Sequence, residues 1–514
     1  ATLTKEGTGM LTLSTANTFS GGTLLNEGIL RIGNNSALGT GSLTITAGQI
    51  SSDSATARTL ANPLNLSGSI AWGDATASGA LTFSGAATLL ADTTLNCGTT
   101  TTVTHIISGV LTDGAGSFRL IKNGSAHLQL NNANTYDGGT TIESSRIQAN
   151  NIASFGTGTV QVQSGGQAFF TVGGTNTNNY QIEGAGWTEP SGNLGAIRLT
   201  GTTLSGGISL TSSARITAHG TTGTLTGNIS EVSTPSALEL SNYNTSTNST
   251  ITVSGNNSYT GGTTVKGVIL QANSNNAFGT GPVTIESNGT VARTTRVQLG
   301  TDVVINNDIV INSNAETAFR GAVHSYSGSL ATPSLAVVNG DIEIQSGVGN
   351  GGHLASESGS LSVLRVMGAI NVTNGVAPAI RTGTVELGGG GNYTQLNHQE
   401  GTLRLAAANG ISTSAILGTG LSGATVLDLN GLNQTLAGLT KGSFGGTVIN
   451  NGAVASTLTM NMPTSTSYSG SFVPGLADIH LVKTGVGVLT LSGDSSTALG
   501  SLVVNGGGLN LTGS

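Results

Sequence analysis

Apolar and polar residues alternate along this chain in short runs. Leu11 and Leu13 flank a threonine, and Leu30 and Ile32 flank an arginine. A period of two predicts β-strands with one face turned inward. Gly, Asn and Ser separate the runs, helical spacing is nearly absent, and the strand groups recur about every 20 residues, a coil length typical of solenoids. The pattern therefore predicts an all-β repeat protein.

Ungapped blocks recur within this pattern. Asn17–Thr23, Asn134–Thr140 and Asn257–Thr263 share the order Asn, any residue, aromatic, any residue, Gly, Gly, Thr. Each block leads to a Leu-Gly-Thr-Gly or Phe-Gly-Thr-Gly segment, at 38–41, 155–158 and 278–281. A worn copy begins at Asn392 and a further copy at Lys483. Repeat signatures thus lie near 3–45, 120–163, 250–286, 385–430 and 481–511.

Such repetition predicts a single continuous right-handed parallel β-helix over residues 1–514. At about 4.8 Å between paired strands, roughly 25 coils would give a rod on the order of 120 Å. Equal positions of successive coils would form ladders, in which Asn, Thr and Ser hydrogen-bond while stacked charges repel. An array of β-sandwich domains is the alternative, because the block spacing also suits immunoglobulin-like domains.

Composition agrees with a ladder architecture and excludes several classes of protein. Charged residues make up 8% of the chain and 80 residues are Gly, against about 25% charged residues in ordinary soluble domains. A hydrophobic content of 36% with a net charge of −7 argues against disorder. The mild acidity offers no basic footprint for nucleic acid or an anionic membrane. The lone Cys97 forms no internal disulfide and is expected in the core.

No apolar run is long enough for a membrane-spanning helix, and the first residues lack the features of a signal peptide. The chain is therefore expected to be mature or trimmed. Both ends consist of repeat sequence, at Leu3–Gly7 and at Gly508–Leu511, rather than of the polar caps that usually close a solenoid. We accordingly predict self-association through the terminal coils.

The residues that define the blocks are interpreted as structural. Phe19, Tyr136 and Tyr259 are expected to cap the core beside the Gly-Gly pairs. The pairs are predicted to be turns and not phosphate cradles, since no Lys-Ser/Thr follows them. Lys5, Lys122 and Lys483 are expected to neutralise a carboxylate or pack their alkyl stems rather than act as bases. Finally, Gly22, Gly139 and Gly262 should adopt conformations that a β-carbon would strain.

Candidate chemistry is sparse. The acidic neighbours are Asp302 with Asp308, Asp341 with Glu343, and Glu183 with Glu189. A solvated strand face is the preferred interpretation of each. The histidines show no paired metal-ligand spacing; they are His105, His127, His219, His324, His353, His398 and His480. We predict no catalytic, cofactor or metal site.

Two further features are candidates for binding. An aromatic carbohydrate platform would use Trp187 with Tyr180 and Phe169-Phe170, or Trp72, although two Trp are few for a sugar groove. The least repeat-like stretches, about 167–200 and 313–360, are expected to form loops outside the coils. A carboxylate-lined cleft in either stretch would indicate an enzyme.

The segments Lys5–Leu13 and Asn17–Thr23 resemble the autotransporter-associated beta strand repeat of bacterial autotransporter passengers. Similar segments occur at Lys483–Leu491 and Leu427–Leu436. The resemblance implies a right-handed β-helical passenger exported to the cell surface. No translocator barrel follows Ser514 here, and the middle copies lack the full leading lysine segment, so the chain is expected to be a released passenger, a fragment, or a protein exported by another route.

Two classes of function follow. The first is a non-enzymatic surface β-helix with a structural or adhesive role, which binds other copies, extracellular matrix, polysaccharide or a host surface and polymerises end to end. The alternative is a polysaccharide-degrading or toxin-like passenger whose activity lies in inserted loops. The position and side chains of the insertions distinguish the two classes.

Overall fold

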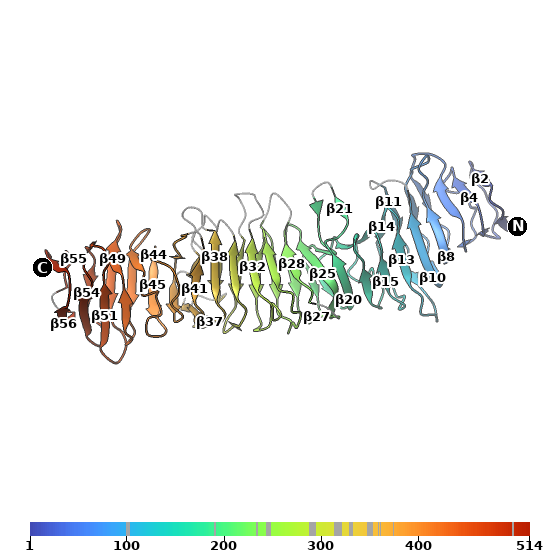
Figure 1. Ribbon diagram of the computed structural model, residues 1–514. Coiled ribbons are helices and arrows are strands. Elements are labelled where there is room, and N and C mark those ends of the chain that lie inside the picture. The colour runs from blue at the N-terminus through green and yellow to red at the C-terminus, as the bar shows by residue number, and fades with distance from the viewer. Residues whose placement is uncertain are drawn as a thin grey trace. The chain divides into compact units, whose positions relative to one another are not determined.

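The computed structural model covers residues 1–514 and is shown in Figure 1. It describes all of them except 99–102, 190–191, 233–234, 243–247, 287–294, 313–320, 328–332, 347–352, 358, 360, 374, 496–497 and 514, and the side chain of Ser346. The regular structure of the described residues consists of β-strands, without a helix. The prediction of an all-β fold is confirmed.

The chain divides into two compact units. Unit 1 contains 1–251 and 257–261, and unit 2 contains 252–256 and 262–514. Each unit consists of short strands that pair in parallel with the equivalent strand of the next coil (Figure 1). That the two units continue one another as a single β-helix remains a prediction.

In unit 1 the pairing is regular from the first coil. Strand β3 (Thr23–Leu25) pairs in parallel with β1 (Leu3–Lys5) on one side and with β5 (Leu43–Ile45) on the other. Thr23 lies opposite Leu43, a step of 20 residues. The coil length expected from the hydrophobic pattern is therefore present here.

Unit 2 has the same organisation with other residues. Strand β45 (Gly401–Leu405) pairs in parallel with β43 (Thr384–Leu387) and with β47 (Thr425–Asp428). Leu403 and Leu405 point inward and are fully buried. The degenerate copy of the repeat that begins at Asn392 thus forms coils although it lacks the Gly-Gly pair.

The core of each unit is a column of stacked aliphatic side chains. Along β10 (Ala87–Cys97), Leu89, Leu95 and Cys97 are fully buried, while Leu90 between them is half exposed. Burial raises the pKa of the Cys97 thiol to about 11, so this cysteine is an inert core residue, as expected. Inward-facing positions of successive coils are mostly Leu, Ile or Val. Strand pairing keeps these positions in register, so their side chains stack on one another.

Parallel pairing decides between the two predicted architectures. Among the described strands, the antiparallel pair is the hairpin of β21 (Thr188–Glu189) and β22 (Gly192–Asn193). β-Sandwiches consist of antiparallel sheets, so the sandwich alternative is wrong. The fold is a parallel β-helix.

The two units together contain about 20 turns, fewer than the roughly 25 expected. The difference arises because insertions lengthen many coils. Ile309 of β35 (Ile309–Asn312) pairs with Ile342 of β38 (Ile342–Ser346), a step of 33 residues. Ile309 to Ile311 pair in register across this longer step, and the register shifts only at Asn312. A longer coil uses more residues, so the same chain length makes fewer coils.

The Gly-Gly pairs are turns with a left-handed second residue. Gly22, Gly139 and Gly262 have φ angles of 86°, 92° and 89°, a region that L-residues with a β-carbon rarely adopt. A β-carbon on Gly139 would lie 2.6 Å from the carbonyl oxygen of Thr159 in the next coil. The predicted strain at these positions is confirmed.

The Gly-Thr-Gly segments are fastened by an asparagine of the following coil. The Nδ2 group of Asn178 donates to the carbonyl oxygens of Gly156 and Gly158, at 3.0 and 2.7 Å. Asn62 holds the 38–41 segment in the same way, and Asn307 holds the 278–281 segment. One side-chain amide therefore ties each Gly-Thr-Gly turn to its neighbour.

Candidate functional site

The three block lysines lie inside the helix and not at its surface. Lys122 is fully buried, and its Nζ donates to the carbonyl oxygens of Asn123, Gly124 and Ser144, at 2.9, 2.9 and 3.3 Å. Two of these carbonyls belong to its own turn and the third to the next coil. Burial lowers the pKa of Lys122, yet its three donors are all satisfied.

Lys5 and Lys483 have equivalent cages of three carbonyl oxygens. Lys483 donates to Thr484, Gly485 and Gly506, at 2.6, 3.1 and 3.1 Å. Lys5 is bound by Glu6, Gly7 and Glu27. The hydrogen-bond acceptors of these lysines are backbone carbonyl oxygens and not carboxylates, so the expectation of a carboxylate partner is wrong. The lysines connect coils.

The tyrosines of the repeated blocks also have structural roles in the core. Tyr136 and Tyr259 are fully buried, and the Tyr136 hydroxyl lies 2.6 Å from the Thr140 hydroxyl beside the Gly-Gly turn. Phe19 is half-buried. No solvent-facing ring is left at Tyr136 or Tyr259 to stack a ligand.

The acidic neighbours act mainly as backbone acceptors between coils. Asp308 Oδ1 accepts from the Asp341 amide at 2.9 Å, and Asp341 Oδ1 accepts from the Ala369 amide at 2.8 Å. Asp302 accepts from the Leu335 amide, and Glu343 from the Gln345 side chain. These contacts hold turns in place and do not form a paired acid and base.

The stretch 167–200 carries the antiparallel hairpin, whose residues 190 and 191 lie outside the described residues. Glu189 of this hairpin faces Arg198 at 3.4 Å and Arg146 at 3.8 Å. The Phe169 ring lies between both guanidinium groups, 4.4 Å from Arg198 and 5.4 Å from Arg146. The result is a compact cation–π and ion-pair cluster.

This cluster replaces the expected aromatic platform. The Trp187 ring is half-buried, with the Arg146 guanidinium 5.8 Å away and His127 against its edge. Tyr180 and Phe170 are buried, and Trp72 is fully buried against Phe83. Glu183 bonds elsewhere, so the hairpin does not bring two carboxylates together.

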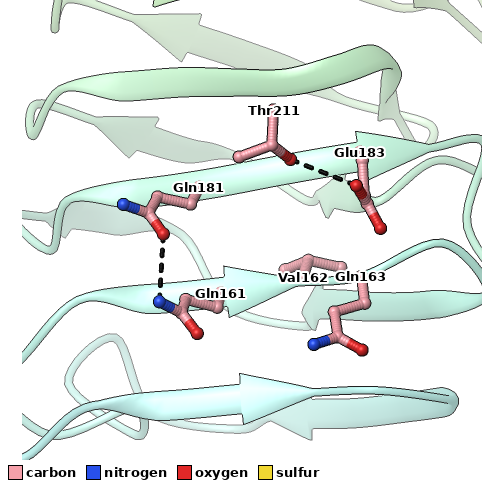
Figure 2. A pocket seen from close by; sticks show the side chains of 6 residues that line it. All are labelled: Gln161, Val162, Gln163, Gln181, Glu183 and Thr211. Atoms are coloured by element: carbon pink, nitrogen blue, oxygen red, sulfur yellow. Dashed lines mark hydrogen bonds between the residues drawn. The ribbon is translucent and has the colours of Figure 1, made fainter. Parts of the chain in front are cut away.

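A polar groove of about 220 Å³ lies on the outer face of unit 1. Figure 2 shows Gln161 and Gln181 on one side, and Gln163 with Glu183 on the other. Gln161 Nε2 donates to Gln181 Oε1 at 3.0 Å, and the Thr211 hydroxyl donates to Glu183 Oε2 at 3.3 Å (Figure 2). Glu183 also accepts from the Ser164 amide at 3.0 Å. The groove is therefore formed by outward-facing polar side chains of neighbouring coils, which stack as a ladder.

A second groove, of about 320 Å³, lies on unit 2. It is lined by Gln271, Asn273, Gly300, Thr301, Tyr326 and Ser327. It adjoins the predicted loop stretch 313–360, of which 313–320, 328–332, 347–352, 358 and 360 lie outside the described residues. An aromatic ring and uncharged polar side chains thus share one concavity.

Metal and membrane features are both missing from the described part of the chain. No three or more His, Cys, Asp or Glu residues gather there in a group that could hold a metal ion. Nor does that part of the chain contain a helix with the length and hydrophobicity needed to cross a membrane.

Together, the parallel ladders and the repeated cages define a repeat-built parallel β-helix. The family model of the passenger-associated-transport-repeat matches residues 3–32, 120–144, 248–272 and 481–511. These four segments are therefore similar to the repeat of autotransporter passengers, in agreement with the resemblance. Searches of the curated proteins and of the solved structures each gave no match.

Three features were not predicted from the sequence. They are the asparagine clasps, meaning the Asn62, Asn178 and Asn307 side chains that bind the Gly-Thr-Gly turns; the arginine cluster around Phe169; and the second groove, which we call the Tyr326 groove. The clasps had a local signal, because Asn62, Asn178 and Asn307 each stand two residues before an inward Leu, Tyr or Ile. The arginines and Tyr326 had no such signal, since their partners come from other coils.

Proposed function

We propose that this chain is a structural and adhesive β-helix of the bacterial surface, and not an enzyme. The passenger repeats and the parallel β-helix support a passenger-like surface protein. The adhesive role rests on one observation: the residues that define the repeat are used within the fold. Lys122, Asn134 and Tyr136 are each buried in contacts within or between coils, which leaves the variable outward ladders to make contacts with partners.

The outward ladders are suited to many weak polar contacts. Gln129 and Gln148 of neighbouring coils are linked by a hydrogen bond of 3.2 Å, and Asn131 and Asn150 by one of 3.1 Å. Amides held in such rows keep donors and acceptors at the strand spacing of about 4.8 Å. An extended partner can therefore repeat the same contact along the rows. Extracellular matrix, polysaccharide and host-cell surfaces are partners of this kind.

Two measurements test the proposal. The gene, with an epitope tag in an outward turn, is expressed in its native bacterium, and intact cells are probed with antibody and protease. We expect surface labelling and loss of the tag after protease treatment. Beads coated with the purified chain should then adhere to matrix or glycan surfaces. Retention of the tag inside intact cells would contradict surface exposure, and non-adherent beads would contradict adhesion.

A further inference from the structure

The Tyr326 groove exists because one rung of an outward ladder lacks a side chain. Strands β31 (Ile269–Ala272), β33 (Arg296–Leu299) and β36 (Val323–Ser325) pair in parallel, with Ala272, Leu299 and Ser325 in register. The next residues are Asn273, Gly300 and Tyr326. Backbone hydrogen bonds continue the ladder: the Gly300 amide donates to the Ala272 carbonyl oxygen, and the Tyr326 amide to that of Leu299, both at 2.8 Å.

Glycine at the middle rung opens a space between the two outer rungs. A β-carbon on Gly300 would lie 2.7 Å from Asn273 Oδ1, so a larger residue would displace the amide and fill the floor. Two strand spacings separate the Asn273 and Tyr326 backbones by about 10 Å. The groove is therefore a slot one rung wide, with an amide on one wall and a phenol ring on the other.

Tyr326 is unusual among the tyrosines of this protein. Six of the seven tyrosines are described, and five of these are buried in the core: Tyr136, Tyr180, Tyr259, Tyr393 and Tyr468. Tyr326 is half-buried and lines the groove. An aromatic ring that borders solvent offers an apolar face together with a hydroxyl that can hydrogen-bond.

The remaining lining is polar and uncharged. Gln271, Asn273 and Thr301 supply amide and hydroxyl groups. The Ser327 hydroxyl donates to Glu357 Oε2 at 3.0 Å. Among the lining residues that the structure describes there is no lysine or arginine, so these residues offer an anionic group no ion-pair partner. The chemistry matches a ligand with many hydroxyls and an apolar ring face.

We propose that this slot binds a neutral saccharide, with one pyranose ring in the place of the missing rung. The ring's C–H face stacks on Tyr326, and the amides of Gln271 and Asn273 exchange hydrogen bonds with its hydroxyls. This proposal names the ligand class of the adhesive role and rests on it. Binding sites of this kind combine an apolar platform with a few placed polar groups.

The test uses the purified 514-residue chain and isothermal titration with neutral hexasaccharides of glucose, mannose, galactose and N-acetylglucosamine. We expect at least one to bind. Tyr326→Ala should weaken that binding about five- to tenfold, the effect of losing a stacking contact of roughly 1 to 1.4 kcal/mol. Tyr326→Phe should retain most of the affinity, and Gly300→Val should abolish binding by filling the slot.

Phe444→Ala is the matched control, because it removes another exposed aromatic ring of unit 2 that does not line the groove; it should leave the affinity unchanged. Circular dichroism melting of each variant separates lost binding from lost folding. The saccharide proposal is overturned if no hexasaccharide binds, or if Tyr326→Ala and Gly300→Val bind as the parent does. Binding of sulfated or carboxylated sugars alone would also overturn it. None of these results bears on surface exposure, which the cell-labelling experiment tests separately.

Discussion

At the residue scale, the protein is held together by polar side chains that are buried rather than exposed. Lys122 lies at 0% exposure with all its hydrogens donated to carbonyl oxygens. A buried ammonium is tolerated only when its hydrogen bonds compensate for lost hydration. Each cage is therefore a specific lock between two coils.

Replacing Lys122 with Met tests the lock. Methionine keeps the length of the side chain but removes the ammonium donor from three inward carbonyls, of which Gly124 O keeps the Ser144 hydroxyl as a donor at 3.1 Å. We expect a loss of about 2–3 kcal/mol in unfolding free energy. Lys266→Met is the control, because Lys266 is a surface residue whose partner is Glu286 at 3.3 Å; it should cost less than about 1 kcal/mol. Equal losses in denaturant titrations would show that the cage contributes nothing.

Buried histidines make the fold sensitive to acid. Burial lowers the pKa of His105 and of His353 to about 4, and Nδ1 of each ring accepts a backbone amide, from Leu81 and Ala379. The unfolded pKa is about 6.5. The unfolded chain therefore binds more protons as pH falls from 6.5 toward 4, and stability that is full above this window is lost within it.

The expected loss is up to about 3 kcal/mol per histidine by pH 4. Denaturant titrations at pH 7 and pH 4.5 measure it. The double variant His105→Gln, His353→Gln has no titratable side chain at these two positions. It should lose clearly less stability on acidification than the parent chain. An identical pH dependence in the two proteins would rule out His105 and His353 as its source.

At the element scale, the short strands depend on their turns. The left-handed Gly of each Gly-Gly pair and the asparagine clasp of each Gly-Thr-Gly turn place the next strand in register. Because a strand has only three to six residues in most coils, a shift of one residue would turn its apolar set outward. The turns thus determine register as much as the strands do.

Gly139→Val tests this dependence. The β-branched side chain must adopt a φ near 92° and approach Thr159 O, so we expect a loss of about 1–3 kcal/mol. Gly445→Val is the control, since Gly445 has no positive φ and no neighbour within 4 Å of a β-carbon. Thermal unfolding of both variants measures the difference. An unchanged midpoint for Gly139→Val would mean that the turn tolerates a side chain.

At the scale of the whole molecule, far-ultraviolet circular dichroism should show β signal with negligible helix. The expectation follows because the described residues contain strands and no helix. A helix content near the globular average of about a third would contradict the fold.

Self-association through terminal coils is a separate prediction from the sequence. An open strand edge can pair with another chain, and head-to-tail contacts need not close. Light scattering over a concentration series should show a mass that rises with concentration. A monomer at every concentration would contradict the prediction.

The sequence by itself determined the strands, the repeat positions and the Gly turns. These follow from alternation and punctuation within about 20 neighbouring residues, which is why Gly139 could be assigned a strained conformation in advance. The role of Lys122 could be only partly predicted, since its burial is local in origin but one of its acceptors, Ser144, lies 22 residues away.

Only the tertiary structure decided which residues of different coils share a rung. Asn273, Gly300 and Tyr326 lie 27 and 26 residues apart, steps longer than the coil of about 20 residues that the hydrophobic pattern predicts, so that pattern alone does not bring them together. The same holds for Glu189 with Arg146 and Arg198. Coil register is the sum of all preceding loop lengths and pairings, and for that reason both grooves and the arginine cluster had to be read from the fold.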